Sequence, residues 1–318
     1  MTDPPQADDA ARRVLLCGWA SLDDGEATVG DVATLEAMSS AFARADVLHD
    51  VAWSSNFSPR PGHPHAVASV DHVDPVVYTD VVFVCGPCAG RQITRLHMRF
   101  AHCRRIAVGV SVVDRHSDAV RGFDAVIARD GTDDPPRADL SFAVRGTDVP
   151  VVGLCLAPGQ AEYGDRRRHD RAHALIVDWL GGIDCAVEHL DTRLDTATPA
   201  RLRTVDHFDS RMARVDLVVT TRLHGLVRAL CDGVPAVAVD PVRGGAKVTA
   251  QCAAVSWPAL LQADDLSAAR LTAWYRWCQT LGARRQVRQS AREGAVAAAA
   301  AIDAVVDRIR LSPSAPGG

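Results

Sequence analysis

The stretch Thr220-Thr221-Arg222-Leu223-His224-Gly225 combines residue types that can bind and protonate an anion. It follows the apolar run 217–220, which predicts a buried strand, and the apolar spacing beyond it predicts a helix that starts two or three residues later. The first turn of a helix has free N–H groups and carries about half a positive charge. An arginine there adds a bidentate grip on phosphate or carboxylate, and a histidine exchanges protons near neutral pH. We therefore expect an anion site with Arg222 and His224; the alternative is a threonine-capped helix with both side chains in solvent.

A second stretch with similar chemistry ends at Lys247. Of the 35 lysines and arginines only Lys247 is a lysine, a scarcity that a GC-rich genome explains most simply. Lys247 ends a glycine-containing run, 240–247, that follows the apolar strand expected at 235–239. Because carboxyl ends of neighbouring parallel strands meet at one edge of a sheet, we expect Lys247 near Arg222 and His224. The alternative is a lysine left by chance.

Two further stretches follow predicted strands. Gly25 to Asp31 follows the first strand and leads into a helix through Gly30 and Asp31. This loop is expected at the mouth of a ligand cleft, with Asp31 as helix N-cap as the alternative; it lacks the three-glycine dinucleotide fingerprint.

The motif Cys85-Gly86-Pro87-Cys88 lies between a strand and a helix, the setting of a redox pair. A simple Gly-Pro turn, or a zinc site completed by His97 and His102, are the alternatives. The cysteine-to-histidine gap is shorter than in a zinc finger, and we expect no metal site.

Composition limits the class of protein. The chain has 318 residues, 47% hydrophobic and 23% charged, with a net charge of -4. These values are typical of a globular protein of two domains and give no support to nucleic-acid binding. The nine cysteines are spread along the chain, so they do not indicate a disulfide scaffold. The polar start and the absence of a membrane-length apolar run lead us to expect a cytoplasmic protein.

Apolar runs separated by helical patterns predict parallel sheets covered on both faces. Strands are expected at 14–18, 81–84, 106–110, 125–127, 151–156, 183–188, 217–220 and 235–239, and helices at 32–44, near 91–103, and at 166–180, 223–231 and 285–310. The polar segment 132–139 and Pro150 indicate a boundary. We expect two Rossmann-like α/β domains whose parallel sheets face a cleft, at 13–148 and 149–311, between disordered ends at 1–12 and 312–318.

Several of these stretches together resemble the polysaccharide pyruvyl transferase family. The likeness is specific at 216–225, 230–235 and 247–248, and looser at Gly30-Asp31, Arg129-Asp130 and Asp139. It implies a fold similar to GT-B glycosyltransferases and a transferase of polysaccharide biosynthesis. Such an enzyme moves pyruvate from phosphoenolpyruvate, its co-substrate, to a carbohydrate acceptor, usually as a ketal.

The resemblance also implies site roles. Arg222 and His224 are expected to meet the donor, with His224 as general acid, and Thr221, Gly225 and Lys247 are expected to help bind it. No cofactor beyond the donor is expected.

The sequence departs from the family pattern at two places. The glycine-rich turn of the first domain is the degenerate motif Cys85-Gly86-Pro87-Cys88, and no arginine stands at Leu156-Ala157-Pro158, where members often carry one. Arg129, Arg166 or Lys247 are candidates to compensate. The departures keep two other hypotheses open: a glycosyltransferase that uses a nucleotide sugar, or a divergent, non-catalytic homologue that binds an anion. The acceptor, the regiochemistry and the oligomeric state are left open.

Overall fold

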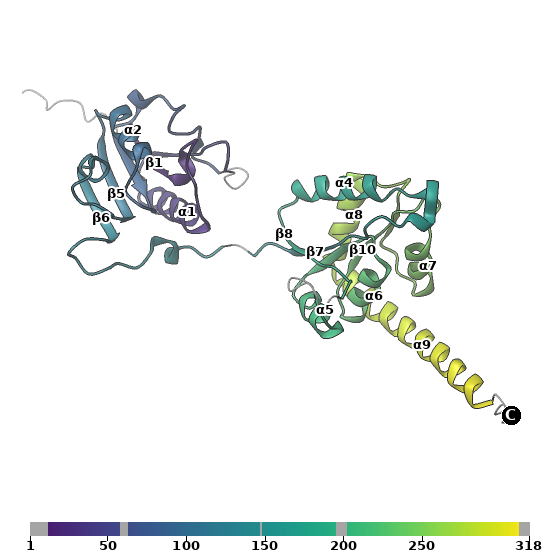
Figure 1. Ribbon diagram of the computed structural model, residues 1–318. Coiled ribbons are helices and arrows are strands. Elements are labelled where there is room, and N and C mark those ends of the chain that lie inside the picture. The colour runs from purple at the N-terminus through teal and green to yellow at the C-terminus, as the bar shows by residue number, and fades with distance from the viewer. Residues whose placement is uncertain (1–11, 58–62, 147, 195–201, 312–318) are drawn as a thin grey trace, which may run out of the picture. The chain divides into compact units, whose positions relative to one another are not determined.

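The protein consists of two compact α/β units, Met1–Thr147 and Asp148–Gly318, each with a parallel sheet (Figure 1). The computed structural model describes residues 12–57, 63–146, 148–194 and 202–311. The predicted class, two α/β units with parallel sheets, is confirmed. The disorder expected for 1–12 and 312–318 lies, apart from Arg12, outside the described residues.

The sheet of the first unit has six parallel strands in the order β3-β2-β1-β4-β5-β6. Its strands are β1 (Val14–Gly18), β2 (His49–Ala52), β3 (Ala66–Val67), β4 (Asp80–Val84), β5 (Arg104–Ser111) and β6 (Ala125–Asp130). Its helices are α1 (Val29–Arg44), α2 (Arg91–Arg99) and α3 (Asp118–Arg121), with short 3-10 turns at Trp19–Ser21, Pro75–Val77 and Leu140–Ala143.

Alternation along the central strands separates two cores in this unit. Leu15 and Phe83 point to one face of the sheet, where they pack with α2, whereas Leu16 and Val82 point to the other, where they pack with α1. Side chains on a strand alternate between faces, so continuous apolar runs are what a sheet covered on both sides requires.

The sheet of the second unit has five parallel strands in the order β11-β10-β9-β7-β8. Its strands are β7 (Val151–Cys155), β8 (Ala186–His189), β9 (Leu217–Thr220), β10 (Ala236–Asp240) and β11 (Leu260–Gln262). Its helices are α4 (His169–Gly181), α5 (Val205–Met212), α6 (Leu223–Cys231), α7 (Lys247–Ala254), α8 (Ala268–Cys278) and α9 (Leu281–Leu311), with a 3-10 segment, η4, at Ala161–Arg166.

The strand order fixes where this unit can bind a ligand. From β7 the chain crosses to β8 on one side, whereas from β9 it crosses to β10 on the other. The connections therefore diverge at the adjacent pair β7 and β9, and a crevice opens beyond the carboxyl ends of such a pair. Residues that follow β7 and β9 are the ones placed to line it.

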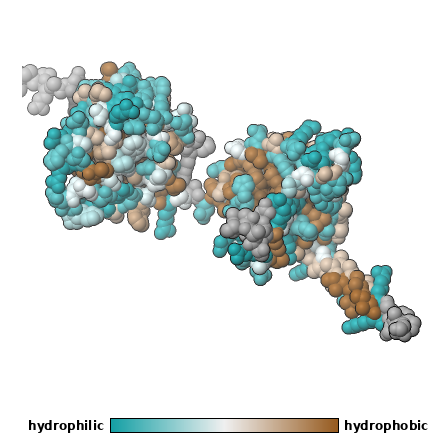
Figure 2. All heavy atoms as spheres, in the orientation of Figure 1, coloured by the Kyte–Doolittle hydropathy of each residue, from teal (hydrophilic) through white to brown (hydrophobic). Residues whose placement is uncertain are grey.

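Helix α9 ends in several turns that extend past the rest of its unit (Figure 1). Apolar side chains remain exposed along them, among them Val296, Ile302 and Ile309 (Figure 2). Among the described residues, no helix combines the length and apolarity needed to cross a membrane.

A matched pair of substitutions on α4 tests the core of the second unit. Ile176 is 0% exposed within the core, whereas its neighbour Val177 is 53% exposed. We expect Ile176→Ala to lower the free energy of unfolding by about 2–5 kcal/mol, since it leaves a cavity. Val177→Ala should change it by less than about 0.5 kcal/mol. Urea denaturation followed by circular dichroism measures both, and equal effects would contradict the described packing.

Candidate functional site

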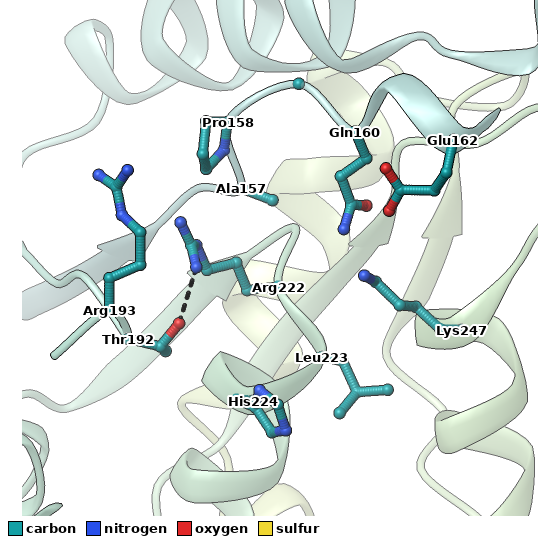
Figure 3. A pocket seen from close by; sticks show the side chains of 11 residues that line it. Ala157, Pro158, Gln160, Glu162, Thr192, Arg193, Arg222, Leu223, His224 and Lys247 are labelled. Atoms are coloured by element: carbon teal, nitrogen blue, oxygen red, sulfur yellow. Dashed lines mark hydrogen bonds between the residues drawn. The ribbon is translucent and has the colours of Figure 1, made fainter. Parts of the chain in front are cut away.

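A cavity of about 380 Å³ opens at the carboxyl ends of β7 and β9, at the predicted crevice of the second unit (Figure 3). Its walls come from the segments that follow β7, β8 and β9 and from the start of α7. The lining residues are Ala157, Pro158, Gly159, Gln160, Glu162, Thr192, Arg193, Arg222, Leu223, His224 and Lys247. Three of the sequence-predicted residues, Arg222, His224 and Lys247, thus meet in one cavity.

Arg222 is the N-cap residue of α6, and its side chain ties three segments together. Nε donates to the carbonyl of Leu156 at 3.0 Å, Nη1 donates to the hydroxyl of Thr192 at 2.9 Å, and Nη2 lies 3.4 Å from Asp191 Oδ1. The side chain is only 14% exposed. Arg222 therefore uses three of its five N–H groups to join these segments, and the other two N–H groups are left available for a ligand.

The start of α6 presents backbone donors and an imidazole beside Arg222. Within the described part of the chain, the N–H groups of Leu223, His224 and Gly225 have no protein acceptor. Free N–H groups at a helix start favour anions. His224 is exposed on this first turn and borders the cavity.

Two predicted donor-binding residues lie behind the cavity wall. Thr221 is fully buried; its hydroxyl accepts from Ala157 N–H at 2.8 Å and lies 3.2 Å from His173 Nε2. Gly225 is buried too, and a Cβ on it would lie 2.5 Å from Thr220 Oγ1. Both positions thus face the protein interior and not the cavity. Thr221 and Gly225 support the wall of the cavity from behind.

Lys247 is the first residue of α7, so it lies at a helix start and not within the preceding glycine loop, as the sequence had suggested. Its ammonium lies 5.9 Å from the centre of the Tyr163 ring, and no ion pair or hydrogen bond engages it among the described residues. In Figure 3 it points into the cavity, toward Gln160 and Glu162. It is a cation that the protein leaves available.

Asp240, at the end of β10, holds Lys247 in place. Its buried Oδ2 accepts from Ala246 N–H at 2.7 Å, from Thr249 N–H at 2.9 Å and from the Thr249 hydroxyl at 2.9 Å, while Oδ1 accepts from Val242 N–H at 3.1 Å. The carboxylate thereby closes the loop between β10 and α7 and supplies acceptors for the start of the helix. Asp240 was not predicted from the sequence, although an aspartate at a strand end before two glycines is a usable signal.

The same loop is joined to the segment that follows β7. Arg168 N–H donates to the carbonyl of Pro241 at 2.8 Å, and Arg243 N–H donates to that of Arg166 at 2.8 Å. These bonds fix η4, and with it Glu162, against the loop that carries Lys247. Arg166 itself is exposed and lies over Tyr163, outside the set of lining residues.

Two histidines of α4 support the wall from behind. His169 is buried, with Nε2 3.3 Å from Gln160 Oε1. Burial lowers the pKa of both His169 and His173 below the ordinary value, and the charge of Arg167 lowers that of His169 further, as the charge of Arg222 does for His173. Neutral imidazoles therefore stand behind Gln160 and Thr221, a feature that no sequence motif indicated.

Arg193 and Asp191 are further site residues that sequence reasoning missed. They follow β8, and Arg193 lines the cavity with Thr192. Partial burial opposes ionisation of Asp191, but hydrogen bonds from Arg193 and the charges of Arg222 and Arg193 hold its pKa below the ordinary value. The sequence held a usable signal, because Asp191, Thr192 and Arg193 come three residues after the end of the strand predicted at 183–188.

The candidate residues of the first unit have local roles. Thr28 is the N-cap of α1, and Asp31, at the third helical position, accepts from Thr28 N–H and from its hydroxyl, both at 2.8 Å. Gly30 and Asp31 thus form the first turn of a helix, not a loop, and Asp31 is not the N-cap. Arg129 donates to Asp130, Asp139 and Ser111 at 2.6–2.9 Å, all within its own unit.

The cysteine pair shows no sign of activation. Cys85 and Cys88 are buried, and burial raises the pKa of both thiols, that of Cys88 to about 11. A redox cysteine needs a lowered pKa. His97 and His102 each lie within hydrogen-bond distance of a backbone carbonyl, and no three His, Cys, Asp or Glu side chains of the described ranges gather as a metal site.

Comparison with known proteins gives one family match. The model of the family described as polysaccharide pyruvyl transferase matches residues 156–241, from the end of β7 to the end of β10. This confirms the resemblance over the segment that builds most of the cavity. A search of curated proteins gave no match.

Solved structures show distant likenesses. They include the glycotransferase of kitacinnamycin (11% identity, TM-score 0.32, covering 89% of this chain and 94% of that one) and the Escherichia coli ADP-heptose heptosyltransferase II (14%, 0.27, 84% and 98%). The Methanocaldococcus jannaschii UDP-GlcNAc 2-epimerase is similar at 9% identity and a TM-score of 0.31, covering 90% and 99%. Likenesses this distant do not carry the activities of those proteins over to this chain.

Asp240→Asn tests how Lys247 is held. The amide puts an NH2 group or a weaker acceptor where the carboxylate accepts several bonds, so we expect a loss of about 1–3 kcal/mol in the free energy of unfolding. Thr249→Val, which removes only the hydroxyl bond, should cost about 1 kcal/mol. Thermal and urea denaturation measure both; an Asp240→Asn protein as stable as the original would show that the carboxylate does not hold the loop.

Proposed function

We propose that this protein transfers pyruvate from phosphoenolpyruvate to a carbohydrate acceptor, with the donor bound in the cavity of the second unit. One observation carries the proposal: Arg193, Arg222 and Lys247 line the same cavity, beside the free N–H groups at the start of α6. The family match over residues 156–241 supports the same class of reaction.

The charges suit a small donor with two anionic groups. The basic side chains of Arg193, Arg222 and Lys247 line the cavity, and Glu162 is the one carboxylate among the lining residues. Arginine and a helix start both bind phosphate and carboxylate. A cavity of about 380 Å³ also leaves space for part of a sugar beside so small a donor.

The transfer requires a proton at one carbon of the donor and a nucleophile at the next. His224 gives a proton to the methylene carbon C3, so that C2 becomes electrophilic and an acceptor hydroxyl bonds to it. The bond between C2 and the phosphate oxygen then breaks, and a second hydroxyl closes the ketal. Of the two hydroxyl protons, one replaces the proton that His224 supplied and the other leaves on hydrogen phosphate. An imidazole suits this exchange near neutral pH.

The cations lower the barrier by stabilising the phosphate as it leaves. Charge accumulates on the phosphate oxygens in this step, and groups that are already oriented toward them need no rearrangement. Arg222 meets that condition, because contacts to Leu156, Thr192 and Asp191 fix its guanidinium before the donor binds.

Lys247→Met tests the donor site. Since the ammonium has no ion pair or hydrogen bond within the described ranges, its loss should change the free energy of unfolding by less than about 0.5 kcal/mol. The affinity for phosphoenolpyruvate should fall about tenfold or more, as expected for a lost charge-assisted contact. Calorimetric titration and thermal denaturation measure the two effects. Unchanged affinity would show that Lys247 does not bind the donor and is a lysine left by chance.

His224→Gln separates proton transfer from binding. We expect phosphate release from phosphoenolpyruvate, measured with a panel of glycoside acceptors, to fall by about 10²–10⁴-fold. Donor affinity should change only a few-fold. His207→Gln, an exposed histidine on α5, is the matched control and should leave both unchanged.

The same measurements distinguish the other hypotheses. Stabilisation by a nucleoside diphosphate but not by phosphoenolpyruvate would favour a glycosyltransferase. Donor binding without phosphate release from any acceptor would favour a non-catalytic homologue. A wild-type protein that binds no phosphoenolpyruvate at millimolar concentration excludes the proposed transfer.

A further inference from the structure

One carboxylate joins the two arginines that line the cavity. Asp191 accepts from Arg193 Nε and Nη2, at 2.9 and 2.7 Å on Oδ2, while its Oδ1 lies 3.4 Å from Arg222 Nη2. Asp191 Oδ1 also accepts from the backbone N–H of Arg193 at 3.0 Å. Two guanidinium groups share one carboxylate, so this wall keeps a net positive charge.

The two arginines differ in what they can still bind. Arg222 is 14% exposed, and three of its nitrogens contact protein groups. Arg193 is 49% exposed, and its only side-chain partner in the described residues is Asp191, which leaves Nη1 without an acceptor. Arg193 therefore offers the more available guanidinium edge.

Two of the cations also lie on opposite sides of the cavity. Figure 3 shows Arg193 on one side and Lys247 on the other, with Arg222 and Gln160 between them. A guanidinium is a planar fork that matches the two oxygens of a carboxylate, whereas an ammonium is a point charge without that geometric preference. The two sides therefore suit different anionic groups of one ligand.

We propose that Arg193, oriented by Asp191, forms a carboxylate subsite, and that the phosphate of the same ligand lies toward Lys247 and the start of α6. This assignment rests on the proposed function, because phosphoenolpyruvate carries both groups. Arg193 binds the ligand directly, and Asp191 acts as a positioning residue.

Two partial ligands test the assignment: pyruvate, which has the carboxylate alone, and inorganic phosphate. Arg193→Met should weaken binding of pyruvate and of phosphoenolpyruvate about tenfold and leave phosphate binding nearly unchanged. Lys247→Met should weaken binding of phosphate and of phosphoenolpyruvate and leave pyruvate binding nearly unchanged. Asp191→Asn should weaken pyruvate selectively, an effect that a loss of stability alone would not produce.

Arg211→Met is the matched control. Arg211 belongs to the same unit, is 45% exposed and also pairs with one carboxylate, Glu188 at 3.4 Å, yet it does not line the cavity. Its replacement should leave the affinity for all three ligands unchanged. Titration calorimetry on the full chain, with competition against phosphoenolpyruvate for the weaker ligands, gives the affinities.

The outcomes separate this assignment from the proposed function. If pyruvate binding depends on Arg193 but no acceptor supports phosphate release, the subsite stands and the transfer does not. If the wild-type protein releases phosphate while Arg193→Met keeps its affinity for pyruvate and phosphoenolpyruvate, the subsite is wrong and the transfer stands. Absence of pyruvate binding to the wild-type protein, or equal weakening of phosphate and pyruvate by Arg193→Met, also overturns the subsite.

Discussion

The close approach of α6 to the ends of β7 and β9 is the constraint on which the site depends. At Gly225 the helix lies so near the sheet that a Cβ would come within 2.5 Å of Thr220 Oγ1 and 2.9 Å of Cys155 Sγ. Only glycine fits there without moving the helix or the side chains of Thr220 and Cys155. Because the first turn is pressed against the strand ends, the free N–H groups and the Arg222 guanidinium come to the crevice between β7 and β9. Gly225, which has no side chain, thus determines the position of Arg222 and of the free N–H groups.

Around this contact the protein divides its charged groups into those that hold the site and those left for a ligand. Asp240 is buried and uses both oxygens on the loop before α7, and Arg222 uses most of its donors on neighbouring segments. Lys247 and Arg193 have free donors that border the cavity. Fixed groups of this kind orient their neighbours in advance, and such preorganisation is what a charged transition state requires. The only lysine of the chain, Lys247, is among the groups left available for a ligand.

The sequence predicted the parts of the fold that local pattern determines. Helix α6 has the bounds expected for it, and the apolar strands β7, β9 and β10 lie where continuous valine and leucine runs placed them. Short elements with mixed polarity, such as β2 with His49 and Asp50, were missed because period and length give them no signal. Helix α7 was missed because the glycines before it indicated a loop, while its start depends on Asp240, a contact made in three dimensions. Arg222, His224 and Lys247 were predicted because they belong to sequence motifs. The supporting residues Asp191, His169 and His173 were not predicted, because their contacts are made only in three dimensions.

No arginine stands at Leu156-Ala157-Pro158, but Arg193, which follows the neighbouring strand β8, lines the same cavity. β7 and β8 are paired, with Leu154 opposite His189, so the segments that leave their carboxyl ends run out on the same edge of the sheet. A guanidinium that follows β8 can therefore reach the cavity that one following β7 would reach, and Ala157 and Arg193 both line it. The small side chain at Ala157 leaves that space open, and its N–H bonds to Thr221 instead. A cavity built from several strand ends can thus take its charge from any of the segments that follow them.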